Sequence, residues 1–311
     1  MLQITVPKSN ILLPEYSGAL LEGVTYNKSN NSLLWVEIEG ATLHRYFFDT
    51  AEHQVLSSNL PGDSFGTLGL TTNDDKVVLG NRTGVVAADF STQEITPIVS
   101  YPPNSRTRSN DGKIDPHGNL IVGTMSDFPY ETAAEGSVFR LNSRSLKLET
   151  WKTNTTIANG LGWSPDLTKF YWTDSGSKQV YVYDYDEKSD QISNEKVFFD
   201  VRSITSDPSS APDGMCVSEK GNIFVAVFNQ AAVLKLNSSG EVVTRFNIPA
   251  PRITCVTIGG KNGDEMFVTT AGDHGRGTKS EYEGEDLGGH LFWYKLEESE
   301  SETQFIWGGD V

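Results

Sequence analysis

A pattern of about fifty residues recurs six times along this chain and constrains its fold more than any local motif. Each copy contains a glycine-bearing segment, a polar turn, an apolar strand, a second turn and another strand that ends near an acidic residue or an asparagine. The spacing between leading positions is 43 to 54 residues, the size of one four-stranded propeller blade. The leading positions are Gly23, Gly69, Gly112, Gly160, Gly214 and Thr257.

Short alternating segments and 29 glycines dominate the sequence, and long stretches with helical periodicity are absent. The sequence therefore predicts an all-β fold, a six-bladed β-propeller with four-stranded antiparallel blades around a central channel, as a single domain over 1–311. We expect residues 1–19 to complete the last blade. Two stacked β-sandwiches are the alternative, but they would need a mid-chain break in composition. The expected blades cover residues 20–60, 66–100, 109–153, 158–205, 211–250 and 252–300.

The charge balance excludes one broad class of partner. The chain has 25 Lys and Arg against 41 Asp and Glu, a net charge of −16, which would repel a nucleic-acid backbone. No apolar run is long enough for a membrane span and the first residues do not form a secretion signal, so we expect a cytoplasmic protein. A closed ring of blades needs no partner, which favours a monomer. Cys216 and Cys255 lie in apolar, strand-like contexts and are expected as buried reduced thiols, with one disulfide as the alternative.

Three polar residues occupy the same place in three different repeats, each directly before a glycine. They are Glu22, Asn159 and Asp213, and propeller geometry places them near the central channel on one face. Two carboxylates and an amide oxygen suit one divalent metal ion, Ca²⁺, Mg²⁺ or Mn²⁺, with Zn²⁺ possible. Glycine after each would let the backbone turn and approach a bound group closely. The alternative is that these pairs are only turn formers.

Five segments, in the same order along the chain, resemble those of the gluconolactonase, senescence-marker-protein (regucalcin) and luciferin-regenerating enzyme family. This resemblance implies a six-bladed propeller, one divalent metal held by Glu22, Asn159 and Asp213, and hydrolysis of a small sugar lactone. The segments span residues Leu21 to Val24, Ser109 to Pro116, Gly123 to Met125, Ala158 to Leu161 and Pro212 to Cys216.

The same resemblance implies that Arg108 and Asn110 contact the sugar, through the guanidinium fork and the amide donor and acceptor. Arg108 as an exposed cation and Asn110 as a turn residue remain the alternatives. Some family members read sugar hydroxyls with a glutamate shortly after the Gly-Thr-Met segment, and here Asp127 or Glu131 would substitute for it.

Two long loops, 126–136 and 272–288, are expected to form walls of the pocket on the metal face. His274 and Arg276 in the second loop could reach the substrate, although an exposed loop that carries them for solubility is the simpler interpretation.

The expected mechanism is metal-assisted hydrolysis of the cyclic ester, with Asp213 as the preferred general base. The sequence contains no H-E-x-x-H motif that would indicate another mechanism. A non-catalytic binding propeller is one alternative, since the strand Tyr171 to Asp174 reads YWTD, but this motif occurs once. A calcium-binding regulatory protein is compatible with the same metal site. A paraoxonase-like enzyme is disfavoured because the five histidines are scattered.

Overall fold

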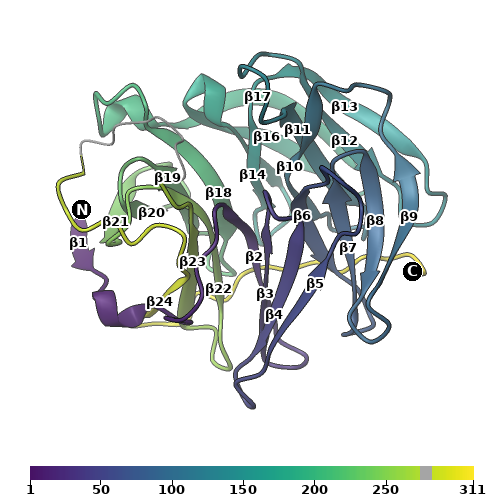
Figure 1. The fold of residues 1–311 in the computed structure, drawn as a ribbon. Helices are drawn as coiled ribbons and strands as arrows, with labels where there is room; N and C mark the ends of the chain where they lie inside the picture. The colour runs from purple at the N-terminus through teal and green to yellow at the C-terminus, as the bar shows by residue number, and fades with distance from the viewer. Residues whose placement is uncertain (274–281) are drawn as a thin grey trace. The chain divides into compact units, whose positions relative to one another are not determined.

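The computed structural model describes residues 1–273 and 282–311, and 53% of the chain is strand. The described residues form 24 strands in six sheets, with three short 3-10 turns (Figure 1). The turns are η1 (Lys8–Asn10), η2 (Ser175–Ser177) and η3 (Val201–Ser203). In each sheet the neighbouring strands follow one another along the chain, apart from β1. These sheets are the blades of a six-bladed β-propeller with four-stranded antiparallel blades as the basic unit, and the predicted fold class is confirmed.

Contacts between residues divide the chain into two compact units. One unit contains Thr25–Asn159 and Gln304–Val311. Its three sheets have four strands each, and the first strand of the first sheet begins at Leu21, within the segment Met1–Val24 of the other unit. Their strands are β2 (Leu21–Asn27), β3 (Ser32–Glu37), β4 (Thr42–Phe47), β5 (His53–Ser57), β6 (Phe65–Leu70), β7 (Lys76–Asn81), β8 (Gly84–Asp89), β9 (Glu94–Ser100), β10 (Thr107–Ile114), β11 (Leu120–Ser126), β12 (Gly136–Leu141) and β13 (Leu148–Thr155).

The other unit contains Met1–Val24 and Gly160–Thr303. Its sheets have four strands, five strands and, among the described residues, three strands. The strands are β1 (Leu2–Thr5), β14 (Ala158–Trp163), β15 (Lys169–Asp174), β16 (Gln179–Asp186), β17 (Gln191–Asp200), β18 (Ala211–Val217), β19 (Ile223–Phe228), β20 (Ala232–Leu236), β21 (Val242–Asn247), β22 (Ile253–Gly259), β23 (Glu265–Thr270) and β24 (Phe292–Lys295).

The inner strands of the four-stranded blades are more buried than the outermost strands. Every residue of β18 is buried, whereas most residues of β17, the fourth strand of the preceding sheet, are exposed. The fully buried first strands carry the small residues that allow neighbouring sheets to pack closely. The apolar core of each unit therefore lies along the first three strands of its sheets, and the polar residues of these strands are held in a closely packed environment.

The N-terminal segment does not complete the last blade in the way that the sequence predicted. Strand β1 pairs in parallel with β21 and extends the fifth sheet, where Ile4 packs against a cluster that contains Phe246. The physical reason is that β21 is the outer strand of the fifth sheet and its free edge accepts a partner. Farther along, isolated bridges join Ile11 to Phe292 and Leu20 to Ala271, so the segment also contacts the sixth sheet.

The C-terminal residues are anchored by buried side chains. Glu300 is buried and accepts hydrogen bonds from Ser218 at 2.7 Å and from Lys235 at 2.6 Å. In the unit that contains Thr25–Asn159 and Gln304–Val311, Trp307 is 1% exposed, and its backbone N–H donates to the carbonyl of Leu70 at 2.8 Å. These residues extend the core beyond the last strand.

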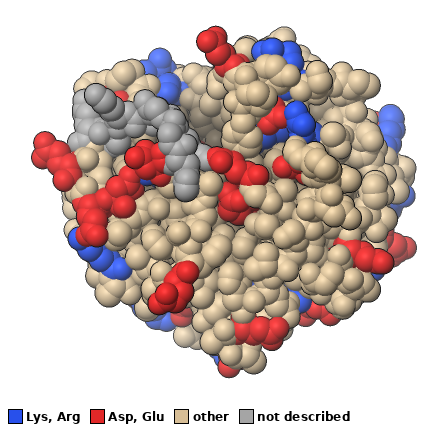
Figure 2. Space-filling view, in the orientation of Figure 1, with Lys and Arg blue, Asp and Glu red and all other residues tan. Residues whose placement is uncertain are grey.

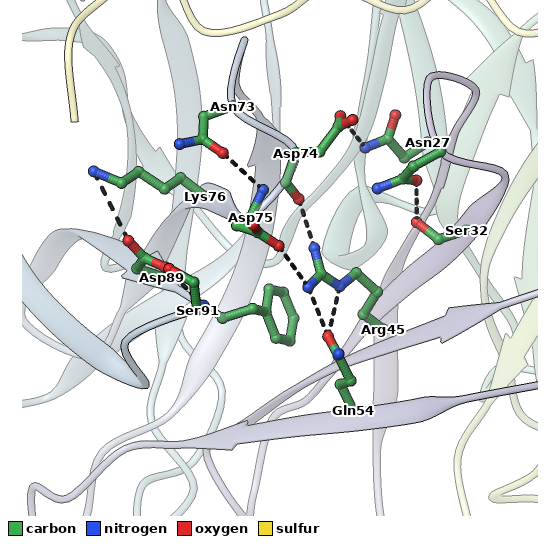
Figure 3. A network of polar contacts seen from close by, with 12 residues as sticks. Asn27, Ser32, Arg45, Gln54, Asn73, Asp74, Asp75, Lys76, Asp89 and Ser91 are labelled. Atoms are coloured by element: carbon green, nitrogen blue, oxygen red, sulfur yellow. Dashed lines mark hydrogen bonds and ion pairs between the residues drawn. The ribbon is translucent and has the colours of Figure 1, made fainter. Parts of the chain in front are cut away.

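A buried arginine joins two sheets of the unit that contains Thr25–Asn159. Arg45 in β4 donates to Gln54 in β5 at 2.9 and 2.6 Å, to the Asp74 carbonyl at 2.6 Å and to the Asp75 carboxylate at 2.9 Å. Figure 3 shows the guanidinium between Gln54 and the turn that carries Asp74 and Asp75. Because this turn connects β6 and β7, the contacts tie the first sheet to the second.

Surface and thiol features agree with the sequence where the structure tests them. Cys216 and Cys255 are buried and form no disulfide, as predicted. Acidic side chains form several separate groups on the face drawn in Figure 2, with neutral residues over most of that face. Among the described residues, no helix has the length and apolar character needed to cross a bilayer.

Candidate functional site

The first strands of the blades are irregular at the places where the predicted site residues lie. In β10 the pairing with β11 shifts register between Ser109 and Gly112, so Asn110 lies in the irregular stretch. In β18 the pairing with β19 shifts between Pro212 and Met215, a stretch that includes Asp213. A β-bulge changes the direction of a side chain and is frequent next to functional sites. Asn110 and Asp213 therefore lie within the first strands of their blades.

Glu22 and Asp213 belong to the unit that contains Met1–Val24 and Gly160–Thr303, and they are 5% and 7% exposed. Glu22 is the second residue of β2, and its Oε2 accepts the backbone N–H of Gly23 at 3.2 Å. Gly23 has a φ of 59°, which favours glycine there. The sequence thus places a carboxylate at a sharp turn within a buried strand.

The glycine after Asp213 has a different role from the predicted one. A Cβ on Gly214 would lie 2.6 Å from Cys255 Sγ and 2.9 Å from Cys255 Cα. Gly160 is similar, because its Cβ would lie 2.5 Å from the Met215 backbone nitrogen. The contacts of these two glycines are with the neighbouring first strand. Their absence of a side chain therefore serves the packing between blades.

Arg108, Asn110 and Asn159 belong to the other unit, and all three are at most 5% exposed. Arg108 Nη1 donates to Ser109 O at 2.8 Å and to Asn110 Oδ1 at 3.0 Å. Asn110 Nδ2 donates to Ala158 O at 3.0 Å. The structure brings Arg108 and Asn110 together beside the residue that precedes Asn159. The alternatives of an exposed Arg108 and a turn residue at Asn110 are both wrong, since the first is buried and the second lies in a strand.

Asp127 directly follows β11 and lies in the loop of residues 126–136. Its Oδ2 forms an ion pair with Arg82 Nη2 at 2.7 Å, and its Oδ1 accepts the Phe128 N–H at 2.9 Å. Asp127 is 5% exposed, whereas Glu131 is exposed. Of the two carboxylates considered after the Gly-Thr-Met segment, only Asp127 is held in a buried position.

Two residues that contact the predicted set were not identified from the sequence. Arg82 lies just after β7 and pairs with Asp127, and Phe128 lies over the Arg108 guanidinium with 4.4 Å from Arg108 Cζ to the ring centroid. Arg82 lies in the loop between the second and third strands of its blade, as residues 126–136 do in the next blade. This position in the blade is the sequence feature that could have identified Arg82 as a neighbour of the predicted site residues.

The second predicted wall, loop 272–288, is described only at its two ends. Arg252 is buried and donates from Nε to the Ala271 and Gly272 carbonyls at 3.0 and 3.1 Å and from Nη2 to Asp286 at 2.5 Å. This arginine therefore holds both ends of the loop. His274 and Arg276 lie outside the described residues.

Glu22, Asn159 and Asp213, which the sequence predicted as metal ligands, are all buried. Glu22 and Asp213 supply carboxylate oxygens and Asn159 an amide oxygen, which is a donor set suited to hard divalent cations. Within residues 1–273 and 282–311, no three His, Cys, Asp or Glu side chains group in a way that could hold a metal ion. The predicted set has two such side chains, Glu22 and Asp213, and its third member, Asn159, is an amide.

The protein is a six-bladed propeller. Several first strands of its blades carry buried carboxylate, amide or guanidinium groups. Residues 20–272 match the family model described as the SMP-30/Gluconolactonase/LRE-like region. The chain belongs to this family, as the motifs predicted.

Three proteins illustrate the similarity. The Cell growth-regulated gene 1 protein of Candida albicans is 35% identical, with all of both chains covered. Pentonolactonase XacC of Haloferax volcanii is 33% identical over 84% of this chain and 84% of its own. A solved structure of a luciferin-regenerating enzyme has a TM-score of 0.84 and 27% identity, and the match covers 96% of this chain and 98% of that one.

Proposed function

We propose that this protein is a metal-dependent sugar lactonase that hydrolyses an aldonolactone to the aldonic acid. The observation that carries the proposal is the buried Arg108–Asn110 pair in an irregular first strand. Membership of the family and the similarity to a protein named pentonolactonase support an ester hydrolase acting on a sugar lactone of the gluconolactone, pentonolactone or deoxyhexonolactone type.

Glu22, Asn159 and Asp213 are the proposed metal ligands. All three are buried, all three offer oxygen donors, and each has the same place at the start of a blade. Two carboxylates neutralise the charge of one divalent ion, Ca²⁺, Mg²⁺, Mn²⁺ or Zn²⁺. When bound, such an ion supplies polarisation of the ester carbonyl and lowers the pKa of water.

Arg108, Asn110 and Asp127 are the proposed substrate-binding residues. Arg108 offers guanidinium donors to the ring and carbonyl oxygens of the lactone, with its orientation fixed by Ser109 O and Asn110 Oδ1. A carboxylate oxygen can accept more than one hydrogen bond, so Asp127 can accept from a sugar hydroxyl while it remains paired with Arg82.

Asp213 is the proposed general base. It would accept the proton of the attacking water at a carboxylate oxygen and release it to the alcohol that leaves when the ring opens. Its burial keeps bulk water away from this carboxylate, and the bulge between Pro212 and Met215 sets its direction.

The test is a pH-indicator assay over pentono-, hexono- and deoxyhexonolactones with protein stripped of metal and then supplied with each of the four ions. We expect hydrolysis of at least one lactone to disappear on stripping and to return with one of the ions. Asp213→Asn should remove the recovery, whereas Glu94→Gln, a change of an exposed carboxylate in β9, should leave it intact. Full activity of Asp213→Asn would exclude this carboxylate as the general base. Metal binding without turnover of any lactone would instead favour a calcium-binding regulatory protein.

We also propose that the protein is a monomer and acts in the cytoplasm. Pairing of β1 with β21 fills the outer edge of β21, and two buried thiols that form no disulfide suit a reducing compartment. Light scattering at several protein concentrations should give one mass near 34.2 kDa. A larger mass at every concentration would exclude the monomer.

A further inference from the structure

The guanidinium of Arg108 is enclosed by its own neighbours. Its Nη1 bonds to Ser109 O and Asn110 Oδ1, and its Nη2 lies 3.4 Å from Met125 Sδ. The ring of Phe128 covers one face, with Arg108 Cζ 4.4 Å from the centroid, within the range of about 6 Å for a cation–π contact. As a result Arg108 is only 3% exposed.

Phe128 is unlike the other groups around Arg108 because it is 49% exposed. Half of its surface faces solvent, so the ring is held on one side by Arg108 and is open on the other. An exposed cation–π contact is weak, and an exposed aromatic side chain changes rotamer rapidly. The cover over Arg108 is therefore the part of its surroundings that can move at least cost.

The backbone that carries Phe128 is fixed at both ends of its loop. Asp127 pairs with Arg82, and its N–H donates to Arg106 O at 2.7 Å. At the other end Glu135 accepts from Ser126 at 2.6 Å and from Arg106 at 2.7 Å. The hydrogen bond from Arg106, followed by that from Ser126, holds the pKa of Glu135 below its ordinary value. Exposure of Arg108 then depends on rotation of the Phe128 side chain and leaves the loop backbone in place.

We infer that Phe128 is a specificity-determining residue that controls access of the substrate to Arg108. A ligand contacts the Arg108 guanidinium only when the Phe128 ring has swung toward solvent, and the displaced ring then forms an apolar wall beside the ligand. Bulk at this position therefore selects against larger lactones. This inference rests on the proposed lactonase function for its substrate, but the cover over Arg108 can be measured without turnover.

The first experiment measures access to Arg108 chemically. Wild type, Phe128→Ala and Phe128→Trp are treated with phenylglyoxal, which modifies arginine, and the modification rate of each arginine is followed by peptide mass spectrometry. We expect the Arg108 rate to rise about threefold or more in Phe128→Ala, from loss of a contact of cation–π strength, and to fall in Phe128→Trp.

Tyr130→Ala is the matched control. Tyr130 lies in the same loop and covers another arginine, with Arg106 Cζ 4.4 Å from its ring centroid. This change should raise modification of Arg106 and leave that of Arg108 unchanged. Equal Arg108 rates in wild type and both Phe128 variants, with native circular dichroism, would overturn the inference.

The second experiment compares kcat and KM for a hexonolactone and a pentonolactone. We expect the ratio of kcat/KM, hexonolactone over pentonolactone, to rise about threefold or more in Phe128→Ala, mainly through KM, and to fall in Phe128→Trp. An unchanged ratio in both variants would refute the specificity role. If wild type hydrolyses no lactone, the proposed function fails, whereas the phenylglyoxal rates still decide whether Phe128 controls access to Arg108.

Discussion

Replacement of Arg45 by methionine removes the one side chain that joins Gln54, Asp74 and Asp75 across two sheets (Figure 3). The Arg45 side chain is 3% exposed, and its guanidinium also lies 4.0 Å from the centroid of the Phe90 ring. Methionine keeps most of the apolar stem but none of the four hydrogen bonds. The change therefore tests how much this polar contact contributes to the stability of the folded chain.

The magnitude follows from the exposure of the partners. A hydrogen bond to a charged group contributes roughly 1.5–3 kcal/mol, and loss of one partner of a buried pair costs roughly 3–5 kcal/mol. The Asp75 side chain is 50% exposed and regains water when Arg45 is lost, which places the expected loss near the lower value, about 3 kcal/mol. With an unfolding entropy of about 2.1 cal/mol/K per residue over 311 residues, we expect Tm to fall by about 5 °C.

Arg202→Met is the matched control for thermal unfolding followed by circular dichroism. Arg202 also pairs with an aspartate, Asp200, but its side chain is 61% exposed, so its loss should lower Tm much less than the loss of Arg45. A Tm for Arg45→Met within 1 °C of that for Arg202→Met would refute the reasoning, because the buried contact would then contribute no more than an exposed one.

Three further predictions concern pH, the C-terminal anchor and the thiols. Burial, and next the charge of His53, lower the pKa of His44 to about 3, so the folded protein binds fewer protons than the unfolded chain below pH 6.5. His44 alone should therefore lower the free energy of unfolding, measured by urea titration, by about 2 kcal/mol between pH 7 and pH 5. His44→Asn should reduce this dependence of stability on pH, and an unchanged dependence would contradict the lowered pKa of His44. Glu300→Ala should lower the free energy of unfolding by about 3 kcal/mol, because the donors Ser218, Asn222 and Lys235 lose their acceptor. The change should also speed proteolysis near the C-terminus. Proteolysis at the wild-type rate would contradict the role of Glu300 in holding the C-terminal residues. Cys216 and Cys255 should react slowly with a thiol reagent in the native protein and rapidly in denaturant, and fast native reaction of both would contradict their burial.

The blade architecture was predictable because the repeats recur at a regular spacing of 43 to 54 residues along the chain. Each blade is a meander of consecutive strands, so a glycine-led segment followed by alternating apolar residues is sufficient to locate it. The parallel pairing of β1 with β21 was not predictable in the same way. A strand of four residues, mostly exposed, carries little periodic signal, and its partner is more than 230 residues away along the chain.

The metal ligands Glu22, Asn159 and Asp213 stay a prediction, which rests on their shared position in the blade. The surroundings of the candidate site residues were not predictable, since contacts such as Asp127 with Arg82 and Phe128 with Arg108 depend on how loops and strands meet in space. The role of Gly214 shows the same limit. Its position suggested a close approach to a bound group, whereas the neighbouring Cys255 occupies the space that a Cβ would need.

The measurement that most directly tests the proposed function is a stoichiometric titration of metal into stripped protein, with hydrolysis of the preferred lactone recorded at each step. We expect activity to rise in proportion to added metal and to stop at about one ion per chain, and we expect Asn159→Ala to need a much higher metal concentration for the same rate. Full lactone hydrolysis by the stripped protein, or recovery in Asn159→Ala at the wild-type metal concentration, would contradict a metal held by Glu22, Asn159 and Asp213.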